Sequence, residues 1–253
     1  MRFLLIPGAG GAAWYWHRVV PLLEAAGHAA VAVDLPADDE SAGLPEYVAA
    51  GVAAARRVQQ RGELIVVGAS LGAFSAPLIA DRVQASLIVL VNGMIAAPNE
   101  TAGQWWAATG HAQAMAEHDL ALGRTPIASP NEAPGGPKFD EAWYFLHDVP
   151  ESVLASAPPV RPQSRSAFAA PFSPAWPDIP TRVIAGRDDR FFPLDFQRRI
   201  ARSRLGLEVE VVPGGHLVAL SHPVELAELL LADAADVLGD PMVGDRRATD
   251  PER

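Results

Sequence analysis

A serine between two glycines is the clearest chemical signal in this sequence. The stretch Leu64-Ile-Val-Val-Gly68-Ala69-Ser70-Leu71-Gly72 runs from a strand-like apolar segment into Gly-x-Ser-x-Gly, and helix-compatible residues follow it. A nucleophile on a strained strand-to-helix turn needs neighbours without a Cβ, so that its hydroxyl can stand clear. Small residues here could also serve only to pack a helix against a strand. The strand-turn-helix context favours a nucleophilic Ser70.

A nucleophilic serine requires a base and an acid to orient that base. A serine hydroxyl attacks poorly until a histidine within hydrogen-bond reach takes its proton, and a carboxylate holds that histidine. His216 stands on a glycine-rich loop directly after one apolar run, and Asp188 and Asp189 stand in an acidic turn after another. The carboxyl ends of parallel strands lie along one edge of a sheet, so these residues can meet there. The sequence predicts a triad of Ser70, His216 and one of the two aspartates.

An oxyanion hole completes this chemistry, because its donors must already point to where negative charge develops. The backbone N–H of Leu71, next after Ser70, is one candidate donor. The other lies in the loop Ile6-Pro7-Gly8-Ala9-Gly10-Gly11, where we assign the N–H of Ala9. Glycines in this loop let the chain come close to a substrate.

The elements that must position these residues follow from the hydrophobic pattern. Short apolar runs alternate with segments of helical period, which is typical of βα units around a mostly parallel sheet. We therefore expect an α/β fold with a six-stranded sheet flanked by helices. The predicted strands are Phe3–Ile6, Ala30–Asp34, Leu64–Val67, Leu87–Val91, Thr181–Ala185 and Val209–Val212.

One long region interrupts the alternation before the strand that carries the acidic turn. Residues 94–177 contain no convincing strand, and an insertion of this length is better explained as a mostly helical lid than as a structureless loop. We expect a core of residues 1–93 and 178–239, a lid of residues 94–177, and a flexible tail at 240–253. Aromatic residues of the lid could be its own core or an apolar wall of a substrate pocket. The candidates for that wall are Trp105, Trp106, Trp143 and Phe145.

Composition excludes several classes of function. The 253 residues include 30 Asp and Glu against 20 Lys and Arg, with Lys138 as the single lysine, so no basic stripe could bind nucleic acid. The absence of cysteine excludes disulfides, thiolate nucleophiles and Cys-ligated zinc. The apolar run Phe3–Ile6 is too short for a signal peptide, and no apolar stretch is long enough to span a membrane. We expect a cytoplasmic protein without membrane or nucleic-acid partners.

Cofactor and metal sites are also weakly supported. Gly8-x-Gly10-x-x-Ala13 after a strand, with Asp34 at the end of the next strand, is a passable dinucleotide-binding fingerprint. However, the residues Trp14, Tyr15 and Trp16 would crowd the position of a pyrophosphate, and no Tyr-x-x-x-Lys pair occurs. For metals, the histidines at 111, 118 and 147 lack a two-His helical spacing with a matching carboxylate. We expect no cofactor and no metal.

The combined motifs resemble the α/β-hydrolases, in the branch of small esterases similar to plant hydroxynitrile lyases and methyl-ester hydrolases. The likeness covers roughly residues 3–93 and 178–238, and it includes the chain order Ser, Asp, His. In that family the acid is the third residue after the glycine of its turn, which implies Asp189 rather than Asp188. The family has His-Gly where this chain has Pro7-Gly8, but the donor there is a backbone N–H, so we expect the hole to persist. The motifs are Pro7-Gly8-Ala9-Gly10, Gly68-x-Ser70-x-Gly72, Gly186-x-x-Asp189-x-x-x-Pro193 and Gly214-Gly215-His216.

The resemblance implies a serine hydrolase that cleaves a small to medium, partly apolar carboxylic ester through an acyl-enzyme. Its catalytic residues would be Ser70, Asp189 and His216, with Ala9 and Leu71 as the oxyanion hole. Fold is not function, and the same fold and triad can serve a hydroxynitrile-lyase-like enzyme or a non-hydrolytic ligand receptor. An NAD(P)-dependent Rossmann oxidoreductase is a remote alternative. The oligomeric state is not predicted.

Overall fold

A six-stranded parallel sheet organises the molecule. The computed structural model describes residues 1–58, 62–126 and 139–239. The strands lie in the order β2-β1-β3-β4-β5-β6, and every neighbouring pair is parallel. The predicted α/β fold and its six strands are therefore confirmed, with ends that shift by one or two residues. The strands are β1 (Arg2–Ile6), β2 (Ala29–Ala32), β3 (Leu64–Ala69), β4 (Leu87–Val91), β5 (Thr181–Gly186) and β6 (Glu210–Val212).

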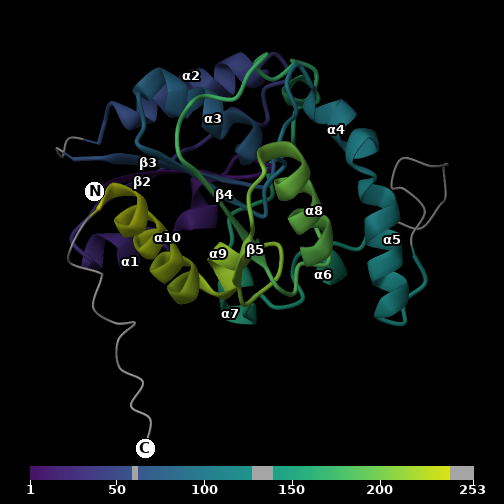
Figure 1. Ribbon diagram of the computed structural model, residues 1–253. Helices are drawn as coiled ribbons and strands as arrows, with labels where there is room; N and C mark the ends of the chain where they lie inside the picture. The colour runs from purple at the N-terminus through teal and green to yellow at the C-terminus, as the bar shows by residue number, and fades with distance from the viewer. Residues whose placement is uncertain (59–61, 127–138, 240–253) are drawn as a thin grey trace, which may run out of the picture.

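Helices cover both faces of the sheet, which explains why its central strands are continuous apolar runs. Successive residues of a strand point to opposite faces. Leu4 and Val66 accordingly pack with one group of helices, and Phe3 and Val67 with the other. Figure 1 shows α2 and α3 on one side of the sheet and α1 and α10 on the other. The first side is covered by α2 (Leu44–Ala55), α3 (Gly72–Val83) and α8 (Leu194–Leu205), and the second by α1 (Val20–Ala25), α9 (Val218–Ser221) and α10 (Pro223–Leu238).

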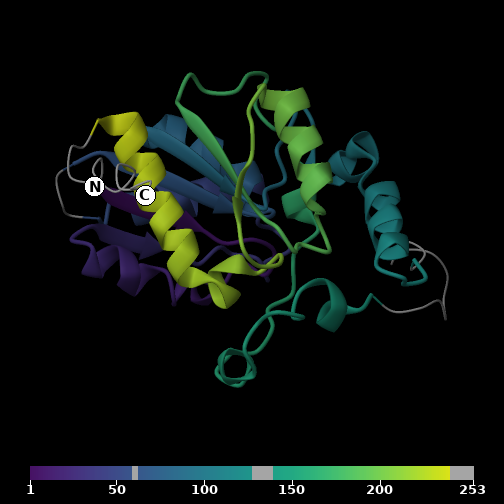
Figure 2. The same ribbon diagram turned by 60° about the horizontal axis from the view of Figure 1, so that its bottom comes forward.

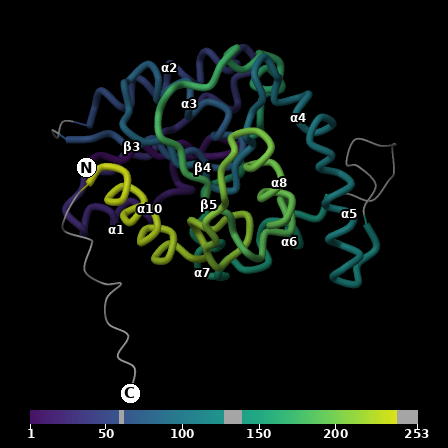
Figure 3. Tube along the Cα trace, viewed as in Figure 1, coloured from purple at the N-terminus to yellow at the C-terminus, as the bar shows by residue number. Residues whose placement is uncertain are grey.

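The long segment between β4 and β5 is helical wherever the structure describes it as regular. Its one β-type pairing among the described residues is an isolated bridge between Thr101 and Pro171. Figure 2 shows α4 and α5 beyond α8, and Figure 3 follows the chain out from β4 and back to β5. The helices are α4 (Ala102–Thr109), α5 (His111–Ala121), α6 (Glu141–Tyr144) and α7 (Glu151–Leu154), with 3-10 turns at Ala13–Trp16 before the sheet's second strand and at Ser166–Phe168 within the segment.

Two sequence predictions fall partly or wholly outside the described residues. The tail predicted at 240–253 is one, and the part of the predicted lid at 127–138 is the other. In the described part of the chain, no helix is both long enough and apolar enough to cross a membrane.

Candidate active site

The turn between β3 and α3 holds Ser70 in a left-handed backbone conformation, with φ of 50°. This conformation is rare for a residue with a side chain and persists only where its surroundings fix it. Three backbone hydrogen bonds do so here. The N–H of Ser70 donates to Val91 O at 3.0 Å, and its carbonyl accepts from Met94 N at 3.0 Å and Ala73 N at 3.1 Å. The side chain of Ser70 is left partly exposed at the ends of β3 and β4.

The two glycines around Ser70 make room for neighbouring segments. A Cβ on Gly68 would lie 2.6 Å from the Cβ of Ala76, and one on Gly72 would lie 2.3 Å from the carbonyl oxygen of Pro7. Gly68 therefore permits α3 to pack against β3, and Gly72 permits the loop after β1 to approach the serine. In that loop, a Cβ on Gly8 would lie 2.9 Å from the Cβ of Ser70. The packing role considered for these small residues is therefore visible in the structure, and the glycines also bring the loop after β1 close to Ser70.

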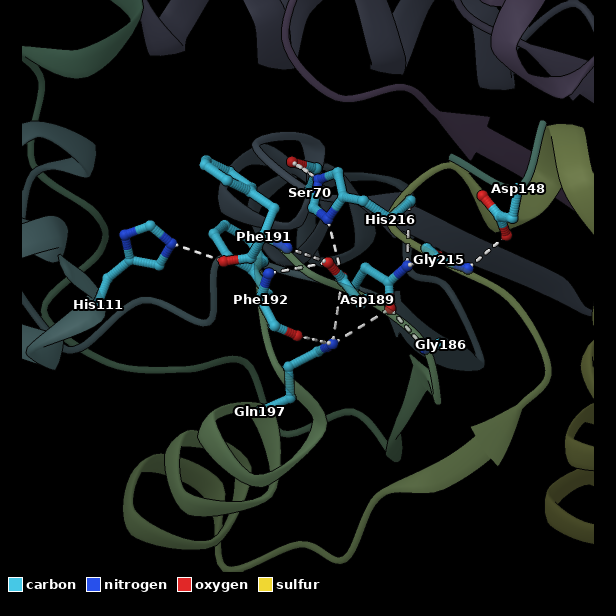
Figure 4. Close-up of polar contacts among 11 residues, drawn as sticks. Ser70, His111, Asp148, Gly186, Asp189, Phe191, Phe192, Gln197, Gly215 and His216 are labelled. Atoms are coloured by element: carbon cyan, nitrogen blue, oxygen red, sulfur yellow. Dashed lines mark hydrogen bonds and ion pairs between the residues drawn. The ribbon is translucent and has the colours of Figure 1, made fainter. Parts of the chain in front are cut away.

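The structure brings Ser70, His216 and Asp189 together in one chain of hydrogen bonds (Figure 4). His216 Nε2 lies 3.0 Å from Ser70 Oγ, and His216 Nδ1 lies 2.9 Å from Asp189 Oδ2. A carboxylate can only accept, so Nδ1 carries the proton and Nε2 accepts from the serine hydroxyl. His216 is 3% exposed and Asp189 is fully buried. This geometry is able to remove the proton of Ser70 and stabilise the imidazolium that results.

The two adjacent aspartates have different environments. Asp189 Oδ1 accepts from the backbone N–H groups of Phe191 at 2.9 Å and Phe192 at 2.8 Å, which aims Oδ2 at the histidine. The Asp188 side chain is about half exposed, and its nearest backbone donor is Gly214 N at 3.3 Å. The structure thus places Asp189, and not Asp188, against His216.

The two predicted oxyanion donors flank Ser70. Leu71 follows Ser70 directly, and Ala9 follows Gly8, which packs against Ser70. Neither N–H donates a hydrogen bond to any group in the described part of the chain. The loop that carries Ala9 is held by the segment between β4 and β5, because Gly10 N donates to Gln163 Oε1 at 3.0 Å. Two free donors beside a nucleophile are what an oxyanion hole requires, so this arrangement around Ser70 is able to form one.

The segment between β4 and β5 is hydrogen-bonded to the loop that carries Asp189 (the acid loop) and to the loop that carries His216 (the histidine loop). His111 Nε2 donates to Phe191 O at 2.8 Å in the acid loop. Burial lowers the pKa of His111 to about 4, so its imidazole is neutral in ordinary buffers. Asp148 Oδ2 accepts from Gly215 N at 2.6 Å, directly before His216 (Figure 4). The sequence did not indicate these contacts, because the partners of His111 and Asp148 lie far away along the chain.

Of the four aromatic residues predicted for a substrate wall, Phe145 is the one placed against the triad. Its ring centroid lies 5.1 Å from that of His216. Trp105 has no exposed surface and donates from its indole to Ile95 O, so it lies in the core between α4 and α8. Trp106 packs on His111, and Trp143 lies under the guanidinium of Arg190 with its indole N–H on Asp119.

Two phenylalanines that were not predicted as part of the substrate wall, Phe191 and Phe192, also pack against His216. The ring centroids of Phe191 and Phe192 lie 5.2 Å and 4.9 Å from that of His216. The sequence offered one signal for these two phenylalanines, which is that they closely follow Asp189.

Across residues 1–58, 62–126 and 139–239, no group of three or more His, Asp or Glu side chains is placed to hold a metal ion.

Comparison with known proteins identifies the family to which this fold belongs. The model of a family described as "Alpha/beta hydrolase family" matches residues 3–229, so the chain belongs to the α/β-hydrolase family. A rice protein (Oryza sativa) named "Probable esterase PIR7A" is 28% identical, over 92% of this chain and 97% of its own length. An "Alpha-hydroxynitrile lyase" of Arabidopsis thaliana is 25% identical, over 94% and 98%. The crystal structure of a polyneuridine aldehyde esterase matches with a TM-score of 0.69 at 25% identity, covering 91% of this chain and 98% of that one.

Proposed function

We propose that this protein is a serine esterase that acts on small to medium, partly apolar carboxylic esters. The observation that carries the proposal is the continuous chain of hydrogen bonds from Ser70 Oγ through His216 to Asp189, next to two free backbone N–H groups. Relatives named as esterases over nearly the whole chain support the same reaction class.

In the proposed reaction, His216 Nε2 takes the hydroxyl proton as Ser70 Oγ attacks the ester carbonyl. The N–H groups of Ala9 and Leu71 stabilise the negative oxygen of the tetrahedral intermediate. His216 then gives its proton to the leaving alcohol, which departs and leaves Ser70 acylated. A water molecule repeats the attack with the same base, so the products are the acid, the alcohol and free enzyme.

The substrate preference is inferred from the aromatic rings around the base. Phe145, Phe191 and Phe192 all pack near His216, and such rings favour an apolar acyl or alcohol group over a charged one. We also propose that residues 94–177 act as a cap on the core of residues 1–93 and 178–239. In this arrangement the cap supplies Phe145 and the core supplies the triad.

Active-site labelling tests this proposal. Wild type and Ser70→Ala are treated with a fluorophosphonate probe, and turnover of p-nitrophenyl acetate and butyrate is measured in parallel. We expect labelling at Ser70, and a loss of kcat on the order of 10⁴-fold or more in Ser70→Ala. Retention of most ester hydrolysis by that variant would reject the mechanism. Labelling of Ser70 without turnover would favour a lyase or a ligand receptor, and lyase activity is then measured as release of cyanide from mandelonitrile.

A further inference from the structure

Two buried amide side chains, Asn92 and Gln197, lie behind the triad, and the reaction described above does not use them. Asn92 is 1% exposed at the end of β4, and Gln197 is 4% exposed on α8. The backbone of Asn92 has φ of 44°, a left-handed conformation that asparagine tolerates better than most residues. A side chain this polar is buried only where hydrogen bonds compensate for lost water.

The side chain of Asn92 joins three segments that meet at the triad. Its Oδ1 accepts from Gly186 N at 2.7 Å, at the end of β5 where the acid loop begins. Its Nδ2 donates to Gly215 O at 3.1 Å and to His216 O at 3.0 Å. One amide therefore ties the carboxyl ends of β4 and β5 to the backbone of the histidine itself.

Gln197 continues this network to the acid. Its Nε2 donates to Phe192 O at 2.8 Å and lies 3.3 Å from Asn92 Oδ1. The same nitrogen lies 3.4 Å from Asp189 Oδ2, the oxygen that also accepts from His216 Nδ1 (Figure 4). Gln197 thus reaches both the carboxylate and the other amide.

The chemistry of this position suits an amide and no other side chain of similar size. Gly215, His216 and Phe192 present carbonyl oxygens that need donors, while Gly186 presents an N–H that needs an acceptor. An amide supplies both kinds of group and carries no charge. A carboxylate here would place a second negative charge beside Asp189 and would face two carbonyl oxygens without a donor.

We propose that Asn92 and Gln197 are positioning residues for the triad. Asn92 holds the backbone of His216 at a fixed distance from the acid loop, and Gln197 limits how strongly Asp189 attracts the proton of His216. The inference rests on the proposed function, because it assigns these residues to the same Ser70 chemistry.

Two substitutions test the two roles with little change of volume. In Gln197→Met the donor on Asp189 Oδ2 is lost, so the carboxylate charge is less compensated and the protonated form of His216 is favoured. In Asn92→Asp the acceptor for Gly186 is kept, but the donors to the histidine loop are lost and a negative charge is added. Both changes should move the acid limb of the pH profile of kcat/KM to higher pH.

The controls repeat each substitution away from the site. Asn99→Asp alters an exposed asparagine that also has a left-handed backbone, with φ of 60°, and Gln113→Met alters an exposed glutamine on α5. Other titratable or charged groups near His216 are unchanged in every variant. These are Asp188, Asp189 and Arg190 of the acid loop, His111, His147 and Asp148 of the segment between β4 and β5, Tyr15 after β1, and His222 before α10.

Two measurements are made on the full-length protein and its variants. The first is kcat and KM for p-nitrophenyl butyrate from pH 5 to pH 9, and the second is an NMR titration of the His216 ring. We expect kcat to fall about 10- to 100-fold with KM nearly unchanged, as for small losses of alignment. The midpoint of the acid limb and of the NMR titration should both rise by about half a pH unit or more.

The outcomes separate this inference from the proposed function. Midpoints equal to those of the control variants would overturn the inference, including the case in which the variants only lose thermal stability. If Ser70→Ala keeps the wild-type turnover, the proposed function fails. The NMR titration then still decides whether the amides act on His216, because it does not depend on hydrolysis.

Discussion

At the scale of single residues, neighbouring side chains of one type have different possible roles because their surroundings differ. Asp189 is fully buried with two backbone N–H donors on one oxygen and His216 on the other. Asp188, one residue earlier, is about half exposed and next to the equally exposed Arg187. A charge that is buried and fully hydrogen-bonded can orient an imidazole, whereas an exposed one is screened by water.

This contrast predicts opposite results for two equivalent substitutions. Asp189→Asn should fold but lose about 10⁴-fold in kcat, because an amide at this position favours the wrong tautomer of His216. Asp188→Asn should change kcat less than about threefold, as expected for a screened surface charge. The measurement is p-nitrophenyl butyrate turnover, with circular dichroism to verify folding. The reverse pattern would mean that Asp188 is the working acid.

At the scale of elements, the segment between β4 and β5 is hydrogen-bonded to three loops that surround Ser70 and His216. Gln163 holds the loop after β1, His111 holds the acid loop, and Asp148 holds the histidine loop. The cap proposed here would therefore align the catalytic groups in addition to contacting substrate.

Asp148 provides the test of that idea. Asp148→Ala removes the acceptor for Gly215 N, so we expect kcat to fall about tenfold through misplacement of His216. Asp148→Asn keeps an acceptor oxygen and should stay within about threefold of wild type. Glu151→Gln, an exposed charge change on α7, is the control. Wild-type kcat in Asp148→Ala would show that the contact does not align the histidine loop.

The contact of α10 with β6 makes stability depend on pH. Asp233 of α10 is 4% exposed, and burial together with the adjacent Glu210 raises its pKa to about 8. An unfolded aspartate titrates near 3.9. Below pH 4 the group is protonated in both states, but between about pH 4 and pH 8 only the folded protein retains the proton. The free energy of unfolding therefore decreases as pH rises through this window.

Asp233→Asn should remove this pH dependence. We expect the variant to gain about 1–3 kcal/mol more in stability, relative to wild type, at pH 9 than at pH 5. Urea unfolding at the two pH values measures the difference. Glu228→Gln, which changes an exposed carboxylate five residues earlier on the same helix, is the control. An equal effect of Asp233→Asn at both pH values would contradict the assignment.

At the scale of the whole molecule, a buried ion pair joins the start of the long segment to α8. Arg204 donates to both carboxylate oxygens of Glu100, and the two side chains are 12% and 8% exposed. Arg204 also donates to Ile95 O at 2.6 Å. Breaking such a pair from one side leaves a buried charge without a partner, which is more costly than removing both members.

A double-mutant cycle tests this coupling. Arg204→Met alone should lower the free energy of unfolding by about 3–5 kcal/mol. Adding Glu100→Gln should recover part of that loss, because no uncompensated charge then remains. Urea denaturation of the wild type, both single variants and the double variant gives the coupling energy. Strict additivity of the two effects would mean that the pair does not connect the segment to α8.

The sequence by itself determined the features that depend on local pattern. Buried parallel strands appear in the sequence as short apolar runs, and the turn at Ser70 needs glycines at fixed positions. The six strands could therefore be predicted to within two residues at their ends, and the strand-turn-helix around Ser70 could be predicted as well. The choice of Asp189 required the family resemblance, because nothing local separates two adjacent aspartates. The structure then placed Asp189, and not Asp188, beside His216.

Only the tertiary structure decided which distant side chains meet. The network of Asn92 and Gln197, the contact of Asp148 with Gly215, and the burial of Trp105 all join residues separated by ten or more positions along the chain. The apolar pattern marks which residues are buried, but hydrogen-bond partners are fixed by how the strand ends and helices come together in space. For this reason an asparagine at the end of a predicted strand carried no signal until the loops around it were in place.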